Sequence, residues 1–266
     1  MYFENINNNT FFILGVPITE SSVTQKFKDF INSDEETIMI TSTPKWTDSE
    51  TQEYKSASVG FNMILNSGYK FITYENLDIS SLNDYKKIII TLDNIWIDSN
   101  KNRTNPSIVG KITLDLMNSI SSFHKNKRIV KLSPGSPYLY NGVGLYLLKY
   151  CPLIDVINSK SSLQLCYEEL CKQKSIKHLP MNIVDTYFTN DGFKPKSINL
   201  IGCIGYAYKN SELLNKLISN IENDDLLYSI QLGKTNIVEK ITIEDLSKLY
   251  IKTDDYKPTT LAIVKP

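Results

Sequence analysis

Short runs of apolar and β-branched residues alternate along the first part of the chain with longer segments whose apolar residues recur every three or four positions. Runs of the first kind are typical of buried strands, and the longer spacing is typical of amphipathic helices. The pattern predicts strands at 11–16, 37–41, 70–75, 86–92, 128–132 and 153–158, and helices at 21–33, 56–68, 107–125, 142–151 and 161–173. This order favours a parallel sheet with helices on its faces.

The remainder of the chain has a different order of elements. It predicts strands at 197–206, 226–233, 236–243 and 259–266, a helix at 211–222 and a short helix at 243–250. Four strands are predicted here with only two helices, so strands and helices no longer alternate, which indicates a mixed sheet. The expected fold class is therefore α/β with two α/β domains, an N-terminal one at 1–160 with a parallel sheet and a C-terminal one at 161–266 with a mixed sheet.

Composition narrows the function. Apolar residues make up 41% of the 266 residues, and the 29 basic residues balance the 29 acidic ones. Zero net charge argues against a nucleic-acid binder that relies on bulk positive charge. No apolar stretch reaches the roughly 18 residues of a membrane span, and the first residues do not resemble a signal peptide. We expect a soluble, cytoplasmic protein without membrane or nucleic-acid partners.

Cysteine and histidine spacing bears on metal binding. The four cysteines contain no C-x-x-C pair, and the chain has two histidines. Structural zinc sites need tightly spaced thiolates and imidazoles, so no metal site is predicted. We expect reduced, mostly buried thiols.

The turn S-P-G-S-P at 133–137 directly follows the strand predicted at 128–132. Ligands of open α/β sheets bind beyond the carboxyl ends of the strands, and a glycine lets a ligand approach the backbone closely. Gly135 is therefore a candidate ligand-binding residue.

Four further segments stand in a set order around this turn. G-V-P ends the first strand at 15–17, N-S-K-S-S follows at 158–162, E-K-I-T-I-E-D-L comes at 239–246, and K-P-T-T-L-A-I-V-K-P closes the chain at 257–266. Together with P-G-S-P-Y-L-Y-N-G-V-G at 134–144, this order resembles the tetrapyrrole methylase superfamily, the class III S-adenosylmethionine-dependent methyltransferases. Members carry a G-D-P-x-x-x-G-x-G loop after the third strand and then a P-G-x-[ST]-[SA] turn. The resemblance covers nearly the whole chain, although no single motif is intact.

The resemblance implies that S-adenosyl-L-methionine binds as cofactor in a cleft between two domains and that the protein is a homodimer. Carried over residue by residue, it assigns cofactor binding to small and apolar residues of the loops. These are Pro17, Pro134, Gly135, Ser136, Leu139, Ser161, Ser162, Ile204 and Gly233. Core packing is the alternative for each apolar member of this set.

The departures from the family pattern affect the expected substrate. The first loop lacks the G-x-G-P-G-D glycines and acid, and Ser136 stands where an aspartate is usual. These changes favour a methyltransferase acting on a peptide or small molecule rather than on a tetrapyrrole. The alternative is a non-catalytic subunit that keeps the fold and binds a partner protein in a biosynthetic complex.

Catalytic residues carry no clear signature. Methyl transfer depends mostly on positioning, and a general base is needed only where the nucleophile must lose a proton. Arg103 lies in a loop that faintly resembles that of peptide-backbone N-methyltransferases of the borosin type, but the flanking tyrosines are absent, which favours a solvated arginine. Tyr138 and Tyr140 follow the Gly135 turn and are candidates for lining the pocket.

Overall fold

The structure is a computed structural model that describes residues 8–41, 58–92, 106–138, 142–151, 153–176, 181–184, 198–201, 219, 221–232, 236–245 and 259–265. The chain divides into two compact units, Met1–Ser161 and Ser162–Pro266. Within the described part, no helix is both long and apolar enough to cross a membrane.

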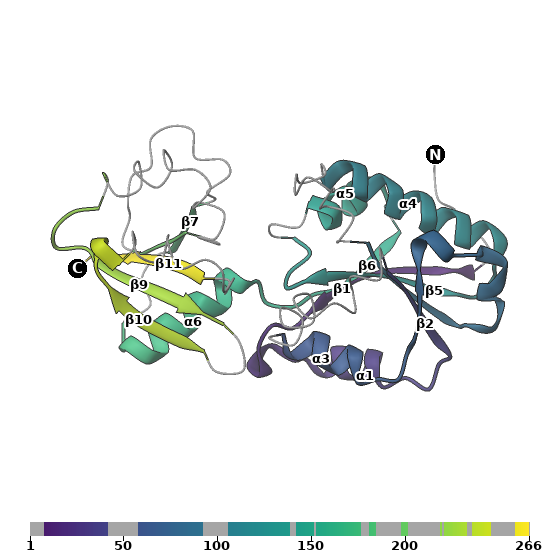
Figure 1. The fold of residues 1–266 in the computed structure, drawn as a ribbon, viewed down its shortest axis with the longest axis horizontal. Helices are drawn as coiled ribbons and strands as arrows, with labels where there is room; N and C mark the ends of the chain where they lie inside the picture. The colour runs from purple at the N-terminus through teal and green to yellow at the C-terminus, as the bar shows by residue number, and fades with distance from the viewer. Residues whose placement is uncertain are drawn as a thin grey trace. The chain divides into compact units, whose positions relative to one another are not determined.

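The first unit has a six-stranded parallel sheet with helices on both faces (Figure 1). Its strands are β1 (Thr10–Val16), β2 (Thr37–Thr41), β3 (Lys70–Thr73), β4 (Lys87–Thr91), β5 (Arg128–Pro134) and β6 (Ile154–Ile157). Its helices are α1 (Gln25–Ile31), α3 (Val59–Leu65), α4 (Pro106–Phe123) and α5 (Gly142–Tyr150), with short 3-10 turns η2 (Glu20–Ser22), η4 (Tyr74–Asn76) and η5 (Ile79–Asp84). The strand order is β3-β2-β4-β5-β1-β6, so the parallel sheet expected from the sequence is confirmed.

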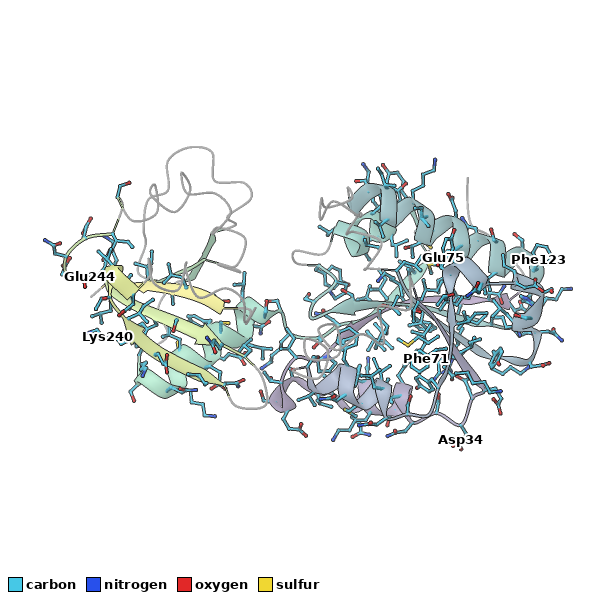
Figure 2. All side chains as sticks on the ribbon, viewed as in Figure 1. Asp34, Phe71, Glu75, Phe123, Lys240 and Glu244 are labelled. Carbon is cyan, nitrogen blue, oxygen red and sulfur yellow. The ribbon has the colours of Figure 1, made fainter. Side chains whose placement is uncertain are left out.

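Alternation of side chains along the strands builds two cores, one on each face of the sheet. Leu14 and Val16 of β1 pack with Phe27 of α1 and Phe61 of α3. The opposite face carries Phe11, Ile13, Ile88 and Ile90 of the strands, with Val109 and Met117 of α4 and Val143 and Leu147 of α5. Figure 2 shows side chains filling both layers. Each fully buried residue of this size stabilises the fold by about 1.5–3 kcal/mol relative to exposure.

The boundaries of several elements differ from the prediction. The helix expected at 21–33 begins only at Gln25, because Thr24 caps it by accepting a hydrogen bond from the Phe27 backbone N–H, and residues 20–22 form a separate 3-10 turn. The strand expected at 70–75 ends at Thr73. The helix expected at 56–68 is shorter at both ends, since α3 spans Val59–Leu65, and Gly68 beyond it has a positive φ of 76°.

The second unit contains a five-stranded mixed sheet. Its elements are α6 (Ser162–Lys174), β7 (Met181–Val184), β8 (Ile198–Ile201), β9 (Leu226–Gln231), β10 (Ile237–Ile241) and β11 (Thr259–Val264), in the strand order β10-β9-β11-β8-β7. Only the β7–β8 pair is parallel among these neighbours. Strand β7 was missed, because M-N-I-V is short and lacks a clear alternation. The helix predicted at 211–222 falls almost entirely outside the described residues.

Three of the four cysteines are described, and all three are buried thiols outside any disulfide bond. Burial raises the pKa of Cys151 and of Cys171. A raised thiol pKa lowers the fraction of reactive thiolate, so these cysteines suit packing rather than nucleophilic chemistry. Cys203 lies outside the described residues.

A buried lysine joins α1 to the sheet at the amino end of β4. The Lys87 Nζ donates hydrogen bonds to the Phe30 carbonyl at 2.7 Å and to the Ser33 Oγ at 2.6 Å. It also lies 4.7 Å from the centroid of the Phe30 ring. Burial lowers the pKa of Lys87 to about 8, and the charge of Glu35 only partly opposes this shift. The ammonium group therefore satisfies hydrogen-bond acceptors at the end of α1, and its burial disfavours the charged form.

Replacing this lysine in a Lys87→Met variant should flatten the alkaline pH dependence of stability. The pKa of Lys87 is about 8 in the folded state against a usual 10.5, so the unfolded state binds more protons between these values. The free energy of unfolding of the unmodified protein should therefore increase over this pH range, by up to about 3 kcal/mol more than that of the variant. Urea unfolding at several pH values measures the difference.

A Lys26→Met variant controls for the change in net charge, because Lys26 is an exposed residue of α1. Equal pH slopes for the Lys87→Met variant and the unmodified protein would contradict the buried-ammonium account.

Candidate functional site

The turns after β1, β5 and β6 come together at one edge of the first unit's sheet. Strand β1 lies between β5 and β6 and is parallel to both. Val16 stands opposite Pro134, and Leu14 stands opposite Ile157, so the three strands end at nearly the same level. The register thus places the turns that contain G-V-P, S-P-G-S-P and N-S-K-S-S at one edge of the sheet.

The chain leaves this edge in opposite directions. After β1 it passes to α1, whose Phe27 packs on one face of the sheet, and after β5 it passes to α5, whose Leu147 packs on the other. Neighbouring parallel strands whose connections go to opposite faces leave a crevice between their carboxyl ends, where ligands of open α/β sheets bind. The pair β1 and β5 forms such a switch point.

Gly15 lets the three turns approach one another at main-chain distance. A Cβ atom at this position would lie 2.7 Å from the Gly135 carbonyl oxygen, 2.7 Å from the Ser159 backbone nitrogen and 3.1 Å from the Ser159 Cβ. Two of these neighbours are backbone atoms, which cannot move aside as the end of a side chain could. Glycine is therefore required here by space.

Gly135 is required for a different reason. Its φ is 63°, in the left-handed region that side chains disfavour, whereas a Cβ would meet only ordinary contacts at 3.5 Å, to Ile18 and to the Lys160 carbonyl. Its backbone N–H donates to the Val16 carbonyl at 3.0 Å. This hydrogen bond ties the β5 turn to the end of β1, so Gly135 has at least a conformational role.

Ser136 links the turn after β5 to the turn after β6. Its hydroxyl donates to the Asn158 side-chain oxygen at 3.0 Å and accepts from the Tyr138 backbone N–H at 3.3 Å. Ser136 is 6% exposed. The residue that stands where the family pattern has an aspartate thus braces two turns through neutral hydrogen bonds.

Pro17 fixes the turn after β1 against α3. Its carbonyl accepts from the Ser58 hydroxyl at 2.8 Å and from the Gly60 backbone N–H at 2.9 Å. A Cβ on Gly60 would lie 2.6 Å from the Pro17 ring, so helix and turn are in close contact. The buried Pro17 therefore contacts the start of α3 through both its carbonyl and its ring.

The remaining predicted site residues differ in burial and in position. Ser161 is buried at the end of the first unit, Ser162 is exposed at the start of α6, Pro134 ends β5, and Tyr138 is half exposed. Tyr146, another tyrosine near these turns in sequence, instead packs its ring on Gly110 of α4. Five predicted residues lie outside the described part of the chain, namely Arg103, Leu139, Tyr140, Ile204 and Gly233.

The described part of the three turns is rich in hydroxyl groups and nearly neutral. Its charged side chains are Glu20, which is exposed, and Lys160, which is half-buried. Thr19 and Ser22 are buried and bonded to each other, since the Ser22 hydroxyl donates to the Thr19 carbonyl at 2.7 Å. The edge thus offers hydrogen-bond donors and acceptors without a strong field of either sign.

Sequence reasoning missed two features of this edge and one of the strand that leads to it. It named Gly15 only as part of G-V-P, although a glycine one residue before the end of a central strand signals close backbone approach. It did not single out Ser159. It also missed Lys131, a fully buried residue of β5 whose Nζ donates to the Leu132 carbonyl.

Metal-like spacing occurs elsewhere, in the second unit. Glu222, Asp224 and Asp225 bring carboxylate oxygens within 4.8 Å of one another. The Lys265 Nζ lies 2.9 Å from Glu222 and 3.6 Å from Asp225, so an ammonium group pairs with two of the three carboxylates. This cluster is therefore assigned to an ion-pair network.

Comparison with known proteins identifies the fold. Models of protein families and curated protein sequences give no match to this chain. Among solved structures, a putative cobalamin synthesis related protein, CobF, from Corynebacterium diphtheriae has a TM-score of 0.57 at 10% identity and covers 97% of this chain and 98% of its own. Uroporphyrin-III-C-methyltransferase from Thermus thermophilus has a TM-score of 0.53 at 11% identity, covering 97% and 92%. The cobalamin biosynthetic enzyme cobalt precorrin-4 methyltransferase, CbiF, has 0.51 at 12% identity, covering 95% and 94%.

The chain therefore has the α/β fold of tetrapyrrole methylases, as the order of its motifs indicated, at 10–12% sequence identity.

A Gly15→Ala variant tests the convergence of the three turns. Its Cβ would overlap two backbone atoms, and relieving such overpacking typically costs about 1–3 kcal/mol of stability. Denaturant unfolding measures the loss.

Gly68→Ala is the matched control, because Gly68 has positive φ but a Cβ added there would have no neighbouring atom within 4 Å. That variant should show only the backbone strain of about 1–2 kcal/mol. A Gly15→Ala protein as stable as the unmodified one would mean that the turns do not meet at this residue.

Proposed function

We propose that this protein binds S-adenosyl-L-methionine at the carboxyl edge of β1, β5 and β6 and transfers its methyl group to an acceptor. The convergence of three turns on Gly15 at a topological switch point carries the proposal. The methylase fold and the order of the sequence motifs support it. Each of the three turns holds at least one residue that the family resemblance assigns to the cofactor: Pro17, Gly135 and Ser161.

The character of the edge suits this donor. When bound, the donor supplies a methyl group already activated by the positive charge on sulfur. The protein then has to hold the donor and acceptor in line and exclude water, which is a positioning task. Main-chain groups beside Gly15 and Gly135, together with the hydroxyls of the turns, can orient a polar ligand through hydrogen bonds from neutral groups.

The acceptor is a separate part of the proposal. Loss of the first-loop acid motivated a peptide or small molecule over a tetrapyrrole, whereas two of the structural neighbours are named for uroporphyrin-III and cobalt precorrin-4. Turnover assays should therefore include tetrapyrroles as well as peptides and small molecules. A soluble, cytoplasmic enzyme remains the working expectation for such assays.

Titration calorimetry with S-adenosylhomocysteine tests donor binding directly. We expect saturable binding with a dissociation constant below about 1 mM, a free energy more favourable than about −4 kcal/mol. ATP is a suitable control, because it shares the adenosine moiety but carries a triphosphate that a nearly neutral edge does not balance. Absence of heat with both S-adenosylhomocysteine and S-adenosylmethionine at millimolar concentration would overturn the proposal. Binding without turnover on any acceptor would instead favour the non-catalytic subunit.

We further propose that the protein is a homodimer. Exposed apolar side chains on α4, α5 and the turn after α5 support association, namely Ile108, Leu145, Tyr150 and Leu153. Light scattering at micromolar concentration should give twice the mass of one chain. A Leu145→Lys variant should shift the equilibrium toward the monomer, because it places a charge among these residues. A monomeric unmodified protein would contradict this proposal.

A further inference from the structure

One buried hydroxyl at the carboxyl edge is unpaired. Ser159 is 5% exposed, and its Oγ has no hydrogen-bond partner within the described part of the chain. The neighbouring hydroxyls differ, since Ser136 donates to Asn158 and Ser22 donates to Thr19. Buried polar atoms without a partner are uncommon in folded proteins, and each calls for a physical reason.

The position of this hydroxyl connects it to the proposed site. Ser159 directly follows Asn158 at the end of β6, and its Cβ lies 3.1 Å from the place where a Gly15 side chain would begin. The Gly135 carbonyl approaches the same place to 2.7 Å. The Ser159 side chain therefore stands where the three turns meet.

Backbone geometry alone does not account for a serine here. In the P-G-x-[ST]-[SA] turn that N-S-K-S-S resembles, Ser159 takes the position of the glycine, so its hydroxymethyl group is an addition of this chain. The group adds no internal hydrogen bond. A hydroxyl that is desolvated by folding and unpaired afterwards is explained if a ligand pairs it.

We propose that the Ser159 hydroxyl is a direct hydrogen-bonding contact to the methyl donor, an inference that rests on the proposed function. The hydroxyl can donate to or accept from a polar group of the donor's nucleoside or amino-acid portion. Ser159 thereby contributes to the affinity for the donor through its side chain, whereas the family motif has a glycine at this position.

The affinity of a Ser159→Ala variant for S-adenosylhomocysteine tests the contact. Alanine keeps the Cβ against Gly15 and removes only the oxygen, so packing of the turns is retained. Calorimetry should show binding weakened by about threefold to tenfold, the latter corresponding to about 1.4 kcal/mol. The melting temperature of the ligand-free variant should be unchanged or higher, because an unpaired buried oxygen has been removed. A merely structural serine would lower that melting temperature instead.

Ser119→Ala is the control, because it removes a hydroxyl from the half-buried Ser119 of α4, which donates to the Asp115 backbone carbonyl away from the three turns. Its affinity should equal that of the unmodified protein.

Two results would overturn the contact while leaving the proposed function intact. They are unchanged affinity in Ser159→Ala, and tighter binding in both Ser159→Ala and Ser159→Gly, which would show that the side chain obstructs the ligand. Failure of the unmodified protein to bind S-adenosylhomocysteine would overturn the proposed function and this inference together, and the first titration of the series separates that case from the other two.

Discussion

The absence of a side chain at Gly15 is the constraint on which the carboxyl edge of the sheet depends. Because Gly15 has no Cβ, the Gly135 carbonyl and the Ser159 backbone can reach the end of β1 from opposite sides. Other contacts build on this approach. The Gly135 N–H bonds to Val16, and Ser136 bonds to Asn158 across the same gap. A Cβ at position 15 would push apart the groups that form the candidate site.

The two cores explain why this edge, rather than the opposite one, suits a ligand. Alternate residues of β1 face α1 and α3 on one side and α4 and α5 on the other, so both faces of the sheet are covered. The connections from β1 and β5 leave for different faces, and ligands of open α/β sheets bind at such switch points. At the amino end of the sheet, the side chains of Lys87 and Asn9 instead donate hydrogen bonds within the fold. Lys87 donates to α1, and Asn9 donates to the end of α4.

The sequence indicated most of the strands and helices because their signals are local. β-Branched runs such as T-I-M-I-T and K-I-I-I-T are buried strands in the structure, and the predicted helix before Gly68 is found as α3. Strand β7 was missed since four residues carry little pattern. The candidate site likewise contains residues with local sequence signals and residues without them. Gly135 could be predicted from its own turn, whereas the approach at Gly15 and the unpaired hydroxyl of Ser159 depend on the register of three strands distant in sequence.

Hydrogen–deuterium exchange with and without S-adenosylhomocysteine tests the central claim, that the three turns form one ligand site. Backbone amides in residues 15–19, 135–138 and 158–161 should all gain protection at the same ligand concentration, because one ligand contacts all three turns. Protection in only one turn, or at the opposite edge around Ser33 and Lys87, would contradict the account.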